Sequence, residues 1–156
     1  MEKTELSEHP LDALQKKETV TLLLKGESAC REAISSLDSV IPQITDESLR
    51  AFASSYRALY EGASERLTHL LEKEGRLDEK KQSSKKSAWL SAQVKLAFRS
   101  HTKELSSLLF DGCHVMLRDL YTHLHGAPHA DLESRRALRR LIGVSEDFRE
   151  VLKDFL

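Results

Sequence analysis

Four long segments of the chain repeat apolar residues at steps of three and four, and this spacing most limits what the chain can fold into. The segments span about 17–40, 45–75, 103–125 and 131–156. Steps of three and four place side chains on one face of an α-helix. In the second segment this apolar face comprises Leu49, Phe52, Tyr56, Leu59, Ala63, Leu67 and Leu70. Helices of roughly 23–30 residues would be about 35–45 Å long, which favours packing along their lengths. With no alternating β-pattern in competition, the spacing predicts an all-α protein, an antiparallel four-helix bundle.

Residues that begin or end helices stand at the boundaries of these segments. Pro42 ends the first segment, Gly75 the second, and Gly126 with Pro128 the third. The run Thr45-Asp46-Glu47 marks the start of the second helix, with an oxygen-bearing cap and acids at the positive end of the helix dipole, and Asp131 can cap the fourth. The links between the first and second helices and between the third and fourth are short, which predicts two antiparallel hairpins.

The two hairpins are joined by a longer connection. Residues 76–87, RLDEKKQSSKKS, offer almost no apolar side chain to bury, so we expect an exposed loop. Trp89 then begins a short amphipathic stretch that we expect to pack on the bundle as a short helix. One long crossover between two hairpins is the ferritin-like topology. Residues 1–16 are expected to be a polar tail and 17–156 a single domain.

Charge and apolar content exclude several classes of partner. Lys plus Arg number 24 and Asp plus Glu 25, so the near-zero net charge favours neither nucleic acid nor an anionic membrane. The lysine run at 80–86 lacks the interleaved aromatics of a single-strand binder. Neither a signal-peptide core nor a run of 18 apolar residues is present, and Cys30 and Cys113 form no CxxC motif. We expect a cytoplasmic protein.

Residues spread along 17–156 also follow the pattern of one protein family. They are Leu24, Gly26 and Arg31-Glu32-Ala33, then Ser48-Leu49-Arg50, Phe52, Leu67 and Gly75, and finally Trp89, Gly112 and Tyr121. In their order and spacing the chain resembles the uncharacterised bacterial four-helix-bundle proteins of unknown function within the ferritin-like superfamily. The resemblance implies a ferritin-like fold and a link to bacterial stress or storage physiology, and it supplies no established reaction.

Three residues are candidate metal ligands. A ferritin-like di-iron centre takes a carboxylate from each of two helices and a Glu-x-x-His pair from each of the other two. The first helix offers Glu27 on its apolar face, and the third offers Asp111 and His114 at an i, i+3 spacing. The second helix has no Glu-x-x-His, and the fourth follows Glu146 with Arg149. The di-iron set is incomplete, but these three residues could bind iron or another divalent metal.

The same side chains also have structural interpretations. Glu27 can serve as a hydrogen-bonded acid inside the bundle, and His114 as a half-buried imidazole that donates to a carbonyl. His123, His125 and His129 cluster where the third helix ends, so they can bind its last carbonyls or form a surface zinc or nickel site.

Two further expectations concern packing. Tyr56 and Tyr60 lie one turn apart and are expected to complete the core with their hydroxyls at its rim. Gly26 and Gly112 both lack a Cβ, so the first and third helices could cross closely there.

Catalytic motifs do not point to an enzyme. The chain contains no GxSxG, P-loop, GxGxxG or HExxH motif. We therefore expect a non-catalytic bundle without a resident cofactor, a stress-associated or protein-interaction module that acts through its surface as a homo-oligomer or with another protein. The alternative is a divergent metal-binding ferritin-like protein with an iron storage or oxidase role.

Overall fold

The computed structural model describes residues 9–76 and 102–156 of the 156-residue chain. In these ranges the chain forms four α-helices: α2 (Pro10–Val40), α3 (Glu47–Lys73), α5 (Thr102–His125) and α6 (Leu132–Leu152). Two short 3₁₀ turns, η1 (Ile41–Gln43) and η3 (Lys153–Phe155), follow α2 and α6. No strand occurs in the described residues, so the prediction of an all-α four-helix bundle is confirmed.

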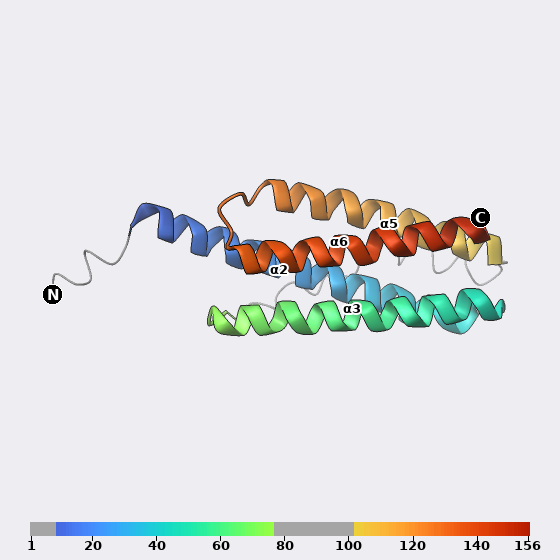
Figure 1. Ribbon diagram of the computed structural model, residues 1–156. Coiled ribbons are helices and arrows are strands. Elements are labelled where there is room, and N and C mark those ends of the chain that lie inside the picture. The colour runs from blue at the N-terminus through green and yellow to red at the C-terminus, as the bar shows by residue number, and fades with distance from the viewer. Residues whose placement is uncertain (1–8, 77–101) are drawn as a thin grey trace.

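The four helices lie along one common axis (Figure 1). α2 packs antiparallel to α3, and α5 packs antiparallel to α6, which gives the two predicted hairpins. α6 also packs against α3, and α5 against α2, so each helix contacts a partner from the other hairpin. In Figure 1, α3 and α5 run in the same direction, and α2 and α6 run in the opposite one.

The end of α3 and the start of α5 lie at opposite ends of the bundle (Figure 1). The predicted crossover, its short helix and Trp89 fall outside the described residues. The crossover and the ferritin-like topology therefore stay predictions.

Local chemistry explains most of the helix boundaries. The side chain of Asp46 accepts a hydrogen bond from the Leu49 N–H at 2.9 Å, and that of Asp131 accepts one from the Ser134 N–H at 2.8 Å. Gly75 has a φ of 72° and closes α3 in the left-handed region that glycine enters at little cost. The two predicted caps and the predicted glycine stop are confirmed.

The first helix begins earlier than the sequence pattern indicated, at Pro10 rather than near residue 17. Proline suits the first helical turn, where its missing N–H is not needed. The Nδ1 atom of His9 accepts a hydrogen bond from the Leu11 N–H at 3.1 Å and so caps the helix. Residues 10–16 are therefore helical rather than part of a tail, and these turns extend past the ends of the other helices (Figure 1).

All four helices contribute side chains to one apolar core. Leu23 of α2, Leu67 of α3, Leu120 of α5 and Leu138 of α6 are almost completely shielded from solvent. Burial of each such side chain contributes about 1.5–3 kcal/mol to folding.

Two apolar residues of α3 lie outside the buried face on which the spacing places them. Phe52 and Leu59 are 41% and 50% exposed, whereas Ala53 is buried. Leu49, Leu67 and Leu70 are buried as predicted, so most of the predicted face of α3 lies in the core.

Gly26 is used for close packing, but against different helices from those predicted. A Cβ at this position would lie 3.2 Å from the Cδ1 of Leu67 and 3.2 Å from both Cδ atoms of Leu138. Gly112 is buried but is not among the nearest neighbours of that position. Gly26 therefore packs closely against leucines of α3 and α6, and the expected close crossing with Gly112 of α5 stays a prediction.

Candidate functional site

The three predicted metal ligands lie in different surroundings. Glu27 is buried in α2, at 1% exposure, whereas Asp111 and His114 are exposed residues of α5. A metal ion needs its donors to converge on one point. Within residues 9–76 and 102–156, no three His, Cys, Asp or Glu side chains group closely enough to hold an ion. The structure does not bring the three together, and their metal role stays a prediction.

The carboxylate of Glu27 is bound by groups of the protein itself. Arg31 donates from Nε to Oε1 at 2.7 Å, and Ser64 donates from Oγ to Oε2 at 3.1 Å. A buried carboxylate is costly unless it is paired and hydrogen-bonded, and here it is both. The bond from Ser64 joins α3 to α2, whereas the bond from Arg31 lies within α2, and both support the structural interpretation of Glu27.

A second buried polar contact joins α3 to α6. The Tyr60 hydroxyl lies 2.9 Å from the Ser145 Oγ, and that Oγ lies 3.6 Å from the sulfur of Met116. The prediction of a hydroxyl at the core rim is wrong for Tyr60, because its hydroxyl lies inside the core beside Ser145.

The two cysteines are buried thiols. Burial raises the pKa of the Cys113 thiol to about 12 and also raises that of Cys30, so both thiols stay protonated at neutral pH.

The three histidines near the end of α5 have separate surroundings. The His129 backbone N–H donates to Oε1 of Glu18 at 2.6 Å, and its Nδ1 lies 3.3 Å from the other carboxylate oxygen. The His125 ring neighbours Tyr121, with centroids 6.3 Å apart. His123 is half-buried, and burial is the main cause of its lowered pKa. His129 thus ties the α5–α6 turn to α2, and the three rings serve different contacts.

A basic groove lies between α3 and α6, beside the first half of α6. It has a volume of about 240 Å³. We call it the α3–α6 groove, and its lining residues are Ala63 and Arg66 of α3 and Glu133, Arg136, Ala137 and Arg140 of α6.

One carboxylate balances part of the charge in this groove. The Glu133 side chain accepts a hydrogen bond from the Arg66 Nη2 at 2.7 Å and another from the Lys73 Nζ at 3.3 Å. Both hydrogen bonds lower the pKa of Glu133, and the bond from Lys73 has the larger effect. The Glu133 carboxylate therefore stays ionised. Arg136 and Arg140 are exposed, and no carboxylate in the described ranges forms an ion pair with either. The groove therefore presents two guanidinium groups, one helical turn apart, to an incoming ligand.

The apolar spacing of the helices does not reveal this groove, although the sequence contains one signal for it. Residues 133–140 read ESRRALRR, and an i, i+4 pair of arginines on a predicted helix marks a local basic face. Because the net charge of the whole chain is near zero, the overall composition did not indicate this local basic face.

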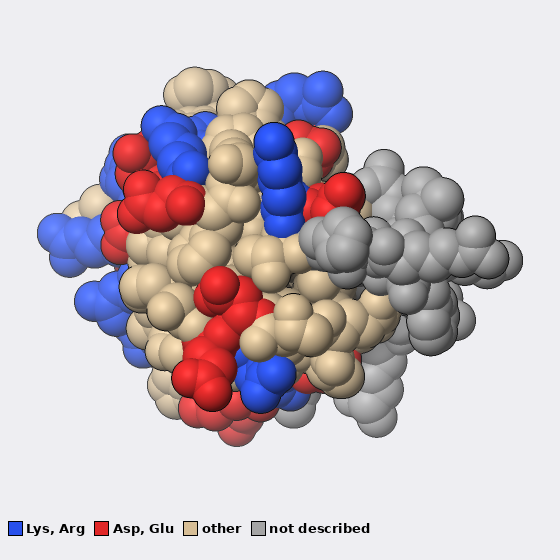
Figure 2. All heavy atoms as spheres, turned by 90° about the vertical axis from the view of Figure 1, so that its right-hand side faces the viewer, with Lys and Arg blue, Asp and Glu red and all other residues tan. Residues whose placement is uncertain are grey.

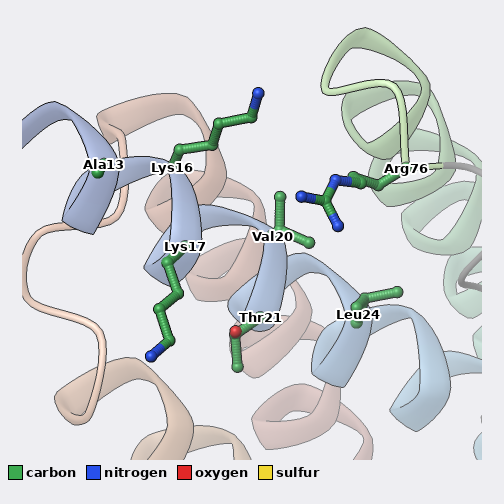
Figure 3. A pocket seen from close by; sticks show the side chains of 7 residues that line it. All are labelled: Ala13, Lys16, Lys17, Val20, Thr21, Leu24 and Arg76. Atoms are coloured by element: carbon green, nitrogen blue, oxygen red, sulfur yellow. The ribbon is translucent and has the colours of Figure 1, made fainter. Parts of the chain in front are cut away.

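A second basic hollow lies at the base of the N-terminal extension of α2. It has a volume of about 340 Å³ and is lined by Ala13, Lys16, Lys17, Val20, Thr21, Leu24 and Arg76. In Figure 3 the Lys16 and Lys17 side chains point away from each other, while the Arg76 guanidinium points toward Val20. The three cationic groups do not converge, and Arg76 is the last described residue before residue 102. We therefore favour the α3–α6 groove as the candidate site.

No family model, curated protein or solved structure matches this chain. Across the described ranges, none of the helices combines the length and the apolar content needed to cross a lipid bilayer.

Proposed function

We propose that this protein is a non-catalytic helical bundle of ferritin-like topology that works by binding another protein through its surface. The observation that carries the proposal is the α3–α6 groove, where Arg136 and Arg140 are exposed without a carboxylate partner in the described ranges. The resemblance described above adds a stress-associated role in the bacterial cytoplasm.

The polar groups of the core support this assignment because they bond to one another. Glu27 is held by Arg31 and Ser64, and Tyr60 by Ser145. These side chains join helices, and the cationic side chains available to a ligand lie on the surface instead.

An exposed apolar side chain lies on the same flank of α3 as two residues that line the groove. Leu59 precedes Ala63 by one turn of α3 and Arg66 by two turns, so the three residues share one flank of the helix. Leu59 is 50% exposed. Arginine beside exposed apolar side chains is typical of protein-binding surfaces, in which arginine and aromatic residues are enriched.

The same flank of α3 continues to the end of the bundle where the C-terminus lies. There Phe52 is 41% exposed and meets Phe155 edge-on, with ring centroids 6.1 Å apart. Figure 2 shows a broad area of uncharged side chains at this end, between separate acidic and basic ones. An apolar strip and a basic groove thus follow one another along α3 and α6.

The direction of the helices supports the ferritin-like part of the proposal. α3 and α5 run in the same direction (Figure 1), which requires a connection that spans the length of the bundle. A ferritin-like bundle has one such long crossover between its two hairpins.

Site-specific photo-crosslinking in cells tests the proposed function. A photoreactive phenylalanine analogue replaces Leu59 in the full chain, and in a control it replaces Val115, an exposed residue of α5. We expect a discrete adduct with one partner protein from position 59 and none from position 115. Equal adducts at both positions, or none at position 59, would contradict the proposal.

Metal analysis separates the proposal from the iron-storage alternative. Untagged protein is incubated with ferrous iron in air, desalted and analysed for bound metal. We expect no uptake above that of a Glu27→Gln variant that still folds, since Arg31 and Ser64 already occupy the Glu27 carboxylate. Stoichiometric iron that is lost in the variant would favour the alternative.

A further inference from the structure

We infer that the α3–α6 groove binds an acidic helical segment of the partner protein, whose carboxylates are held by Arg136 and Arg140. This inference rests on the proposed function and specifies the chemistry of the partner. It follows from the charge, size and surroundings of the groove.

The two arginines match a pair of carboxylates in spacing and in chemistry. Arg136 and Arg140 are separated by one turn of α6, and acidic side chains at i and i+4 on a partner helix have the same repeat. The planar fork of a guanidinium binds a carboxylate through two parallel hydrogen bonds. Arg66 adds a third guanidinium, held in place by Glu133 at 2.7 Å.

The walls of the groove allow a partner helix to approach. Ala63 of α3 and Ala137 of α6 are the small residues that line it, one from each helix. The volume of about 240 Å³ is below the roughly 300–1,000 Å³ that is typical of small-molecule pockets. A space of this size suits one or two side chains of a larger partner. Leu59, further along α3, offers an apolar contact to the same segment.

Other polyanions fit these surroundings less well. Nucleic acid would bring a continuous row of phosphates past the ionised Glu133, and no aromatic side chain lines the groove for base stacking. The chain also has a net charge of −1, so no strong global field attracts a polyanion. The groove therefore favours a ligand with a few carboxylates and an apolar side chain.

Fluorescence anisotropy with designed peptides tests the inference on the full chain. The probe is a labelled helical peptide with glutamates at i and i+4 and a leucine two turns away, and its control has glutamine in place of both glutamates. We expect the acidic peptide to bind with an affinity that falls as salt is added, because salt screens exposed ion pairs. Equal binding of the glutamine peptide, or no binding of the acidic one, would overturn the inference.

Matched arginine variants locate the binding site. Arg136→Gln combined with Arg140→Gln should weaken binding of the acidic peptide by about tenfold, because two charge-assisted contacts are lost. Arg139→Gln removes the same type of exposed side chain from the same helix outside the groove, and it should leave the affinity within about twofold. Circular dichroism melts confirm that each variant folds. An equal loss in Arg139→Gln would overturn the assignment.

Two other probes distinguish the ligand class. A single-stranded oligonucleotide and inorganic phosphate are titrated against the labelled acidic peptide, and we expect neither to displace it at matched ionic strength. Displacement by either one at lower concentration than the unlabelled acidic peptide would overturn the inference. A partner adduct at position 59 without peptide binding would reject this inference and leave the proposed function standing, whereas loss of both rejects both.

Discussion

The two flanks of α3 differ in how completely the charged side chains there are paired within the molecule. On the flank that faces α2, charged side chains are paired within the molecule: Arg57 bonds to Asp38, and Ser64 bonds to the buried Glu27. On the flank that faces α6, Arg66 and Lys73 of α3 are paired with Glu133, but Arg136 and Arg140 of α6 line a groove with no carboxylate bonded to them in the described ranges. The polar groups named at the interface with α2 are already bonded to one another, whereas the two arginines beside the interface with α6 can still bind carboxylates of a partner.

This difference separates residues that hold the bundle together from residues that serve a ligand. A buried polar group must find its partner within the fold, so its removal should lower the free energy of unfolding. An exposed arginine in an open groove contributes little to folding, so its removal should affect binding alone.

Truncation of Tyr60 should produce the largest loss of stability. Tyr60→Ala removes a side chain that is 1% exposed and also the partner of Ser145, so we expect the free energy of unfolding to fall by about 3–5 kcal/mol. Tyr60→Phe keeps the ring and should cost about 1–2 kcal/mol, since only the buried hydrogen bond is lost. Urea denaturation followed by circular dichroism measures both, and equal losses would show that the hydroxyl contributes everything.

Removal of the buried carboxylate should have an intermediate effect. Glu27→Ala deletes the acceptor of Arg31 and Ser64, and we expect a loss of about 1–3 kcal/mol. The control is Asp38→Ala, which breaks the exposed pair with Arg57 and should cost about 0.2–1 kcal/mol. Thermal and urea unfolding compare the two, and a larger loss in Asp38→Ala would reverse the assignment of Glu27 as a helix-joining residue.

His123 should contribute a small pH dependence to stability. Burial lowers its pKa, so the unfolded chain binds a proton at this side chain more readily than the folded chain. Its contribution to stability is therefore present above the unfolded pKa, near 6.5, and is lost as pH falls through the lower folded value. His123→Gln should flatten the decline of unfolding free energy just below pH 6.5. An identical pH profile in the parent and the variant would contradict the prediction.

The groove arginines should have the smallest effect on stability. Arg136→Gln combined with Arg140→Gln should change the unfolding free energy by no more than about 0.5 kcal/mol, because both side chains are exposed. A small gain is consistent with relief of like-charge repulsion at i, i+4. Denaturation in urea measures the change, and a loss comparable to that of Glu27→Ala would show that these arginines hold the fold together.

Features governed by neighbours in the sequence could be predicted, and features that depend on distant contacts could not. The caps at Asp46 and Asp131 and the stop at Gly75 act within a few residues, so they are recognisable in the sequence alone. The spacing placed Phe52 and Leu59 in the core because both are strongly apolar, but packing between helices buries the smaller Ala53 and leaves these two exposed.

The candidate site shows the same division. The sequence placed Glu27 on the inner face of its helix correctly, but Asp111 and His114 flank the buried pair Gly112 and Cys113 and face solvent instead. A groove that brings Arg66 beside residues of α6 depends on how two helices from different hairpins pack, which helical spacing does not specify.

Photo-crosslinking from position 59 in three backgrounds tests the central claim most directly, namely that this bundle acts through the α3–α6 groove. The parent chain should form one discrete adduct, Arg136→Gln combined with Arg140→Gln should lose it, and Arg139→Gln should keep it, with all three equally folded. An adduct that persists in the double variant, or that disappears equally in Arg139→Gln, would contradict the account.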